Sequence, residues 1–471
     1  MSWQSNRDQD ASQVTMPDDA LLAAWSKTLA RHSEKPAIYD PQRRVLFRFR
    51  ELEELSRECA LDFSAGEILA IQIGNHAHWP ALLLACLRRG IVVLPLERTV
   101  STQESATALQ TCRAAGLMTC PDAPIERLAD PGKIDWEDRA PVLLKLTSGT
   151  TAAPRAICFR SAQLRADAEQ ICDTMGLSDR DLNFGVIPLS HSYGFSNLIT
   201  PLLVRGVPIA LSGDRMPRAV LDDLARTETT VFPGMPLFYQ AFSEISDAPA
   251  LPHLRLCISA GAPLTRQVAR SFRAKFGLAI HSFYGASECG GICYDRAATD
   301  DREGFVGPAM DGVEISPNEL TSGASQIEVR SAAVGDGYFP EPEPAKLGHG
   351  VFRPDDLLEI GEAGLRLAGR LSDVINVAGK KVNPAEVEAH LLAYEGVRQA
   401  IVFGRASNLR NEEVTACVVA ASGTEEAALL QFCRQRLSGW QVPKRIFFVP
   451  KMPTNERGKI SRRELAAHFA A

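Results

Sequence analysis

The chain has 471 residues, which exceeds a single ordinary hydrophobic core and predicts a large body with at least one further domain. Its hydrophobic fraction of 45% and charged fraction of 23% are typical of a folded globular protein. The formal net charge of -6 provides no broad basic face, which argues against nucleic acid as a partner and favours small molecules.

The ends and the cysteines bear on location. Residues 1–19 are polar and lack the features of a signal peptide, so we expect a loose leader. Apolar stretches such as 79–87 fall well short of the roughly 20 residues that span a bilayer, so we expect no membrane partner. The 11 cysteines include no CxxC pair and favour a reducing cytoplasm. Cys289 and Cys293 have no second Cys/His pair at ligand spacing, so we interpret them as packing residues.

The first part of the chain alternates strand and helix patterns. Apolar periodicity predicts strands at 67–73, 90–94, 142–146 and 254–259, and helices at 79–89 and 163–175. This βαβ order predicts a layered α/β body with largely parallel sheets. Ligands of such folds bind at the carboxyl ends of the strands.

The pattern changes near residue 370. Residues 364–367 complete one unit and residues 369–373 begin another, which predicts an N-terminal body of 1–369 and a C-terminal domain of 370–471. The second part has predicted strands at 400–403, 414–420 and 445–449 and a helix at 425–437. We expect a small α/β cap with its own core.

A candidate phosphate loop follows the strand at 142–146. Residues 146–155 read LTSGTTAAPR, and their hydroxyl and backbone N–H groups can surround phosphates while the final arginine neutralises charge. They do not form a Walker A loop, because GxxxxGK[ST] cannot be fitted to them. A surface turn is the alternative for this stretch taken alone.

Three further stretches carry weaker signals. Residues 283–288 read FYGASE and combine an aromatic ring that can stack on a base with a carboxylate that can hold Mg²⁺. Residues 352–357 offer a carboxylate for ribose hydroxyls, although an aspartate pair before a strand is usually a turn. Residues 453–460 contain Lys459 beside a glycine, which on its own is an ordinary solvated charge.

Together these stretches resemble the adenylate-forming superfamily of acyl-CoA synthetases, nonribosomal-peptide adenylation domains and firefly luciferase, and in motif the aryl- or acyl-CoA ligases. The resemblance runs from about residue 40 to the end. Five landmarks occur in the family's order, at 147–155, 188–194, 284–288, Asp356 with 369–388, and 458–459. The resemblance implies an N-terminal body of several subdomains with layered sheets and helices, followed by a small mobile α/β cap.

The resemblance implies a role for each motif. The ATP phosphates would be held by Thr147, Ser148, Gly149, Thr150, Thr151 and Arg155. Adenine and the neighbouring groups would be held by Ala260, Gly261, Ala262, Tyr284, Gly285 and Ser287. Glu288 and Thr151 would bind Mg²⁺, and Asp356 would bind the ribose beside a catalytic Arg370. Lys459 would bridge the substrate carboxylate and the α-phosphate during adenylation.

Residues 188–195 resemble the aromatic motif of CoA ligases, in which the histidine, here His191, borders the acyl pocket and acts in catalysis. A packed histidine at a strand end is the alternative. No aspartate occurs at 195–198, which disfavours an α-amino acid substrate. Other expected pocket residues are Met235, Pro236, Ala260, Gly285, Gly290 and Gly291. Their mixture suits an aryl or medium-chain acid.

The implied reaction is ATP-dependent formation of an acyl adenylate with release of pyrophosphate, followed by acyl transfer to a phosphopantetheine thiol. CoA and an acyl carrier protein both remain open as acceptors. Family members rotate the cap between the two steps, which places the hinge at Ser372 and a thiol tunnel at Gly379. The loop departs from the family pattern at Ala152, Arg155 and Ala156, where the family has glycine, lysine and glycine. A degenerate member that binds nucleotide or acyl ligand without turnover is therefore the alternative.

Overall fold

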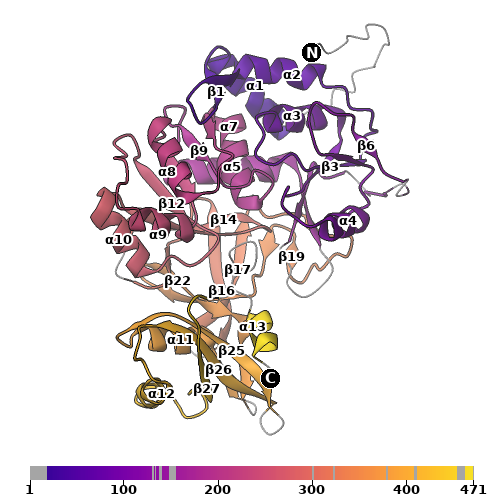
Figure 1. The fold of residues 1–471 in the computed structure, drawn as a ribbon. Coiled ribbons are helices and arrows are strands. Elements are labelled where there is room, and N and C mark those ends of the chain that lie inside the picture. Colours follow the sequence, from indigo (N-terminus) through magenta and orange to yellow (C-terminus); the bar gives the residue numbers. More distant parts are fainter. Residues whose placement is uncertain are drawn as a thin grey trace. The chain divides into compact units, whose positions relative to one another are not determined.

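The computed structural model describes residues 19–129, 132, 134–136, 140–147, 155–299, 302–321, 324–377, 380–407, 411–452 and 462–469. These residues belong to two compact units (Figure 1). Unit 1 comprises the described residues within 1–301, 309–314 and 330–352. Unit 2 comprises those within 302–308, 315–329 and 353–471.

Two large sheets form the frame of unit 1. The first contains β1 (Pro36–Tyr39), β2 (Val45–Arg48), β9 (Asn183–Gly185), β10 (Ile209–Leu211), β11 (Val231–Gly234), β12 (Leu256–Ser259), β13 (Ile280–Ala286) and β14 (Gly290–Tyr294). The second contains β3 (Ile68–Ile71), β4 (Val92–Pro95), β5 (Gly116–Met118), β6 (Glu126–Arg127), β7 (Leu143–Leu146), β8 (Ala156–Phe159) and β18 (Gly337–Phe339). A short hairpin joins β19 (Leu347–Gly348) to β20 (Val351–Phe352).

The strand orders confirm the predicted α/β body with largely parallel sheets. The first sheet has the order β14-β13-β12-β11-β9-β10-β1-β2, and every neighbouring pair from β13 to β1 is parallel. The second has the order β18-β8-β7-β4-β3-β5-β6, with a parallel centre from β7 to β5. Antiparallel strands close the ends of both sheets.

The helices of unit 1 begin and end at local sequence signals. They are α1 (Ala20–His32), α2 (Phe49–Glu58), α3 (Trp79–Arg89), α4 (Thr102–Thr111), α5 (Ser161–Met175), α6 (Ser192–Gly194), α7 (Thr200–Arg205), α8 (Pro217–Arg226), α9 (Pro236–Glu244) and α10 (Arg266–Phe276), with a π-helical turn η1 (Phe195–Ile199). Helix α3 has the predicted bounds because Pro80 suits its first turn and Gly90, at φ 67°, ends it. No helix of the described residues is long and apolar enough to cross a membrane.

Unit 2 contains a sheet that the sequence pattern did not predict. Its strands are β15 (Phe305–Gly307), β16 (Val313–Thr321), β17 (Ala324–Ser331), β21 (Asp356–Gly361) and β22 (Gly364–Arg370). Strands β15, β22, β21 and β17 follow one another with antiparallel pairing, and β16 pairs with β17. The expectation of parallel sheets therefore holds for unit 1 and fails here.

The last hundred or so residues of the chain form a second sheet of unit 2, together with three α-helices among the described residues (Figure 1). Its elements are η2 (Leu371–Asp373), β23 (Ile375–Val377), β24 (Lys380–Val382), α11 (Pro384–Leu392), β25 (Val397–Ser407), β26 (Asn411–Ala420), α12 (Glu426–Arg434), β27 (Arg445–Phe448) and α13 (Arg462–His468). The strand order is β24-β23-β26-β25, with β27 parallel to β26. Val402, Val418 and Leu429 belong to one buried cluster, so these elements have the expected core of their own. The domain boundary at 369–370 stays a prediction.

Phe232 of β11 lies at the centre of an aromatic cluster in unit 1. Its side chain is fully buried, and its ring centre lies 5.4 Å from that of Tyr239 and 5.6 Å from that of Phe242. Tyr239 also donates hydrogen bonds to the carbonyl oxygens of residues 232 and 258, at 3.0 and 2.8 Å. The cluster therefore joins β11 to α9 and to the next strand.

We predict that Phe232→Ala lowers the free energy of unfolding by about 3 to 5 kcal/mol, because it leaves a cavity among rings that cannot collapse around it. Leu237→Ala on α9 is the control, because Leu237 is 60% exposed and should change stability by less than about 0.5 kcal/mol. Urea denaturation followed by tryptophan fluorescence measures both. Equal effects of the two substitutions would show that the cluster does not stabilise unit 1.

Candidate functional site

The hairpin of β13 and β14 carries the candidate adenine and magnesium residues. Tyr284 pairs with Cys293, and Gly285 pairs with Gly291, with a register shift between the two pairs. A Cβ atom at Gly285 would lie 2.5 Å from the carbonyl oxygen of Gly290, so the close approach of the two strands requires glycine. Glu288 lies in the connecting turn and is partly exposed.

The hairpin turn contacts the histidine motif. Ser192 donates a hydrogen bond from Oγ to Oγ of Ser287 at 2.9 Å. His191 precedes α6, and its Nδ1 accepts the N–H of Tyr193 at 3.3 Å, so the imidazole caps this helical turn. The interpretation of His191 as a packed histidine is wrong, because the residue is exposed.

The same turn is linked to the end of the candidate phosphate loop. Tyr338 of β18 donates a hydrogen bond to Oε1 of Glu288 at 3.0 Å. The guanidinium carbon of Arg155 lies 4.2 Å from the centre of the Tyr338 ring, and Arg155 also donates to Glu343 at 2.7 Å. The N–H of Thr147 donates to the carbonyl oxygen of Arg155 at 2.8 Å, which ties the start of the loop to its end.

The charges around Tyr338 support its role as the donor in the hydrogen bond to Glu288. Burial raises the pKa of Tyr338, and the charge of Glu288 raises it further, so the phenol stays neutral and donates. The hydrogen bond to Glu343 raises the pKa of Arg155, so the guanidinium stays positive. The cluster therefore places one fixed cation and one neutral donor beside the carboxylate of Glu288.

Tyr338 and Glu343 were not among the predicted site residues. Their segment, 337–343, was not identified as a motif, and its only sequence signal is an aromatic pair followed by two glutamates among prolines. Strand β18 pairs with β8, which begins directly after Arg155. This pairing explains how Tyr338 reaches the loop.

The candidate adenine and acid residues lie at the ends of neighbouring strands. Tyr193 donates hydrogen bonds from its hydroxyl to the carbonyl oxygens of Gly234 in β11 and Ile258 in β12, each at 3.3 Å. The predicted pocket residue Met235 follows β11, and Ala260 follows β12. Ala260 is buried, whereas the adjacent predicted residues Gly261 and Ala262 are exposed. The structure thus brings the histidine motif to the carboxyl ends of two parallel strands, where ligands of such sheets bind.

The candidate ribose residue lies in unit 2. Asp356 of β21 and Arg370 of β22 are cross-strand partners, and Nε of Arg370 donates to Oδ1 of Asp356 at 2.9 Å. The side chain of Asp356 is 14% exposed and that of Arg370 is 64% exposed. The neighbouring Asp355 is exposed. The arginine therefore orients the carboxylate that was predicted to bind the ribose.

The described residues fit a magnesium ion that is shared with a nucleotide. They contain no group of three or more His, Cys, Asp or Glu side chains that could hold a metal by themselves. Mg²⁺ needs only one or two protein carboxylates when phosphate oxygens and water complete its octahedron. The predicted ligand Glu288, in the turn beside Ser287, is a partly exposed carboxylate of this kind. Cys289 and Cys293 are fully buried and free, as expected of packing residues.

Several predicted residues lie outside the described part of the chain. They are Ser148, Gly149, Thr150, Thr151, Ala152, Gly379 and Lys459. Ser372 lies in the short helical turn η2. Their roles in phosphate binding, catalysis and the hinge stay predictions.

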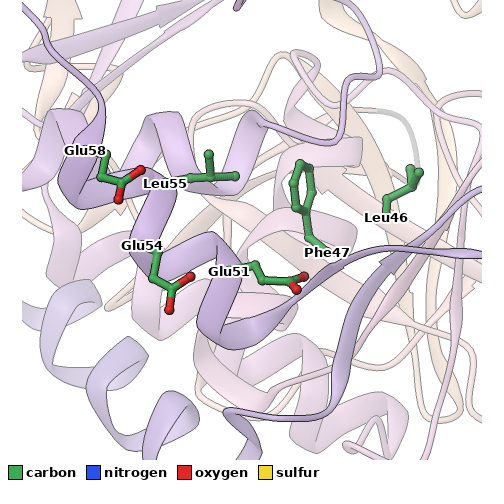
Figure 2. A pocket seen from close by; sticks show the side chains of 6 residues that line it. All are labelled: Leu46, Phe47, Glu51, Glu54, Leu55 and Glu58. Atoms are coloured by element: carbon green, nitrogen blue, oxygen red, sulfur yellow. The ribbon is translucent and has the colours of Figure 1, made fainter. Parts of the chain in front are cut away.

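A groove of about 380 Å³ lies elsewhere in unit 1, between β2 and α2. Figure 2 shows Glu51, Glu54 and Glu58 along the helix, with Leu55 and the two strand residues Leu46 and Phe47 beside them. None of these six residues belongs to the predicted site.

The comparisons with known proteins agree with the motifs. A family described as AMP-binding enzyme matches residues 25–141 and 128–316, and its C-terminal domain matches residues 386–459. A probable CoA ligase, CCL9, from Humulus lupulus is 26% identical across 96% of this chain and 97% of the relative. A feruloyl-CoA synthase from Amycolatopsis sp is 28% identical across 86% of this chain and 89% of the relative.

A solved structure of ATP-bound MatB from Rhodopseudomonas palustris shares the fold, with a TM-score of 0.82 and 24% identity. The match covers 95% of this chain and 98% of that chain. The family and relative matches confirm the resemblance that the motifs indicated, and the solved structure confirms the fold. The chain belongs to the adenylate-forming AMP-binding enzymes, the family that includes acyl- and aryl-CoA ligases.

Proposed function

We propose that this protein is an AMP-forming acid–thiol ligase. It activates a carboxylic acid with ATP to an acyl adenylate, releases pyrophosphate, and transfers the acyl group to the thiol of CoA. Family membership and two near-full-length relatives that are named as CoA-forming enzymes support this proposal. An acyl carrier protein would present the same phosphopantetheine thiol and is the alternative acceptor.

One observation carries the proposal, namely that the turn between β13 and β14 contacts both the histidine motif and, through Tyr338, the end of the proposed phosphate loop. The turn holds Ser287 against Ser192 of the histidine motif, through a hydrogen bond of 2.9 Å. It also holds Glu288 against Tyr338, which stacks on Arg155 at the end of the phosphate loop. The histidine motif and the end of the proposed phosphate loop therefore contact adjacent residues of one turn, Ser287 and Glu288.

This arrangement suits adenylation because the substrate carboxylate and the phosphates of ATP repel one another. Attack at the α-phosphorus requires that the two be held in line, and preorganised cations offset the repulsion. Arg155 provides one fixed cation, and Lys459 is proposed to provide a second at the reacting oxygens. Magnesium, when bound with ATP, supplies further charge neutralisation. Glu288 is the described residue that would hold it, and Thr151 is proposed as a second ligand.

The second half-reaction requires a different arrangement of catalytic groups. Following the family resemblance, we propose that the cap rotates about Ser372 after the adenylate forms, so that Lys459 withdraws and the segment of Gly379 lines a thiol tunnel. Asp356 and Arg370, bonded to each other at 2.9 Å, are proposed to keep the ribose in place. Hinge residues are commonly positions at element ends that absorb large backbone changes.

The proposed substrate is an aryl or medium-chain acid without an α-amino group. The candidate walls are Met235, Ala260 and glycines of the hairpin, a set without charged side chains that suits such an acid. The feruloyl-CoA synthase among the relatives has an aryl acid in its name, which favours the aryl class. All eleven cysteines are free, which supports the cytoplasm as the proposed location.

The rival proposal is a degenerate member that binds ligands without turnover. Ala152, Arg155 and Ala156 replace the family's glycine, lysine and glycine, and Arg155 is occupied by its ion pair with Glu343 at 2.7 Å. A paired guanidinium neutralises phosphate charge less effectively than a free ammonium. This observation favours a slow first step over a fast one.

Acid-dependent exchange of radiolabelled pyrophosphate into ATP separates the two proposals. We predict exchange with at least one member of a panel that contains benzoate, ferulate, octanoate and phenylalanine, and none with phenylalanine. CoA consumption, followed with a thiol reagent, then identifies the acceptor. ATP binding by calorimetry without exchange for any acid would favour the degenerate binder.

We predict that Glu288→Gln slows pyrophosphate exchange by about 10² to 10³, because a neutral amide is a poor ligand for the nucleotide-bound metal. Glu341→Gln is the matched control, because this exposed glutamate lies in the same loop as Glu343. Steady-state exchange at saturating acid measures both variants. If the two variants exchange at the same rate, Glu288 is not the metal ligand.

We predict that Asp356→Ala raises the KM for ATP by about 10- to 100-fold, because the ribose hydroxyls lose a charged acceptor worth about 1.5 to 3 kcal/mol per hydrogen bond. Asp355→Ala is the comparison, because Asp355 is adjacent and exposed. A larger effect of the second substitution would transfer the ribose role to Asp355. Initial rates over a range of ATP concentrations distinguish these results.

A further inference from the structure

A lysine is buried in the strand that leads to the phosphate loop. Lys145 of β7 is 5% exposed and lies two residues before Thr147. Its Nζ donates a hydrogen bond to Oγ of Ser196 at 3.3 Å and lies 4.6 Å from the centre of the Phe159 ring. Burying an ammonium group is costly unless an opposite charge or hydrogen bonds compensate for the lost water.

The compensating charge is Asp167 of α5, which is 3% exposed. Burial lowers the pKa of Lys145 and raises that of Asp167, whereas the attraction between the two charges opposes both shifts. A hydrogen bond with the side chain of Ser196 also favours the charged form of Asp167, so the serine links the ammonium to the carboxylate. These three side chains, Lys145, Ser196 and Asp167, form a buried polar chain.

The far end of the buried polar chain holds the hairpin. Oδ1 of Asp167 accepts the N–H of Gly291 at 3.1 Å. A Cβ atom at Gly290 would lie 2.0 Å from the same oxygen, so the backbone of the hairpin is packed directly against the carboxylate. Gly290 also has a φ of 71°, a left-handed conformation that favours glycine. Glu288 lies only a few residues before this contact.

The buried polar chain therefore touches three segments that adenylation would use. Lys145 precedes the phosphate loop, Ser196 follows the histidine motif in η1, and Asp167 binds the strand after Glu288. A buried charge pair contributes little net stability compared with apolar side chains of similar volume. It does favour one arrangement of the groups around it, because any other arrangement leaves a charge unpaired.

We propose that Lys145, Ser196 and Asp167 are positioning residues that hold the turn of Glu288 in register with the phosphate loop for adenylation. This inference rests on the proposed function. The hydrogen bond from Gly291 to Asp167 is the final link of the buried polar chain, and the positive charge of Lys145 favours the charged form of that carboxylate. None of the three side chains touches the reacting atoms in this account.

Two double variants separate positioning from stability. Lys145→Met/Asp167→Leu removes both charges and the acceptor for Gly291. Lys145→Met/Asp167→Asn also removes both charges but keeps an amide oxygen for Gly291. Because each variant removes the charges as a pair, neither leaves a buried charge alone, and we expect both to fold with melting temperatures close to that of the unaltered protein.

We predict that the leucine variant loses about 30-fold in kcat for pyrophosphate exchange while its KM for ATP changes less than about threefold, because small misplacements of reacting groups are costly. The asparagine variant should keep kcat within about threefold of the unaltered protein, because a neutral amide accepts the same hydrogen bond from Gly291 and needs no lysine to offset a buried charge. Amide hydrogen exchange, measured by mass spectrometry on peptides that cover 284–292, should rise in the leucine variant alone. This second readout needs no substrate.

Equal kcat and equal amide exchange in the two double variants would overturn the proposal and leave the buried polar chain with a structural role only. Ser196→Ala keeps both charges and is the milder variant if the leucine variant does not fold. It should lower kcat and increase amide hydrogen exchange at 284–292. Unaltered values of both quantities would also overturn the proposal. If none of the acids tested supports pyrophosphate exchange by the unaltered protein, the proposed ligase function is wrong. Amide hydrogen exchange at 284–292 would then still decide whether the buried polar chain positions the hairpin.

Discussion

The hydrogen bond from Tyr338 to Glu288, at 3.0 Å, connects strand β18 to the turn between β13 and β14, and the candidate site of unit 1 depends on this connection. It lies between a hairpin that carries a carboxylate and a strand whose neighbour begins at the end of the phosphate loop. The direction of this bond follows from charge, because burial and the nearby glutamate keep the phenol neutral. The neutral phenol, itself stacked on Arg155, orients the carboxylate of Glu288 and leaves its negative charge in place for the proposed magnesium ion.

Two polar connections reach the hairpin at different residues. Arg155 and Tyr338 reach the turn itself, whereas Asp167 binds Gly291 just beyond it. Both connections begin beside the phosphate loop, at its last residue and in the strand before it. A site that must bring two anions together benefits from such fixed geometry, because preorganised groups need no rearrangement as charge develops. The glycines at 285 and 290 permit the close backbone contacts on which both connections depend.

Local signals predicted much of the fold, and contacts between distant residues account for what was missed. Helix α3 has the bounds that apolar periodicity predicted, because Pro80 lies in its first turn and Gly90 follows its last residue. The antiparallel sheet of unit 2 combines short hairpins with long-range pairings, and the position of β15 beside β22 could not be predicted because the two strands are far apart in the sequence. In the site, motif order indicated Glu288 and Asp356, but Tyr338 lies 50 residues from its partner. The sequence did not identify Lys145 as a site residue, because it lies within an apolar strand and its partners lie on other elements.

A crystal structure with ATP and Mg²⁺ bound would show whether the proposed phosphate and acid sites meet at the turn of Glu288. We expect the metal to contact the carboxylate of Glu288 and phosphate oxygens, with the triphosphate beside residues 147–155. Tyr338 should still donate its hydrogen bond to the same carboxylate. A nucleotide bound away from this hairpin, or a metal held by other carboxylates, would contradict the account.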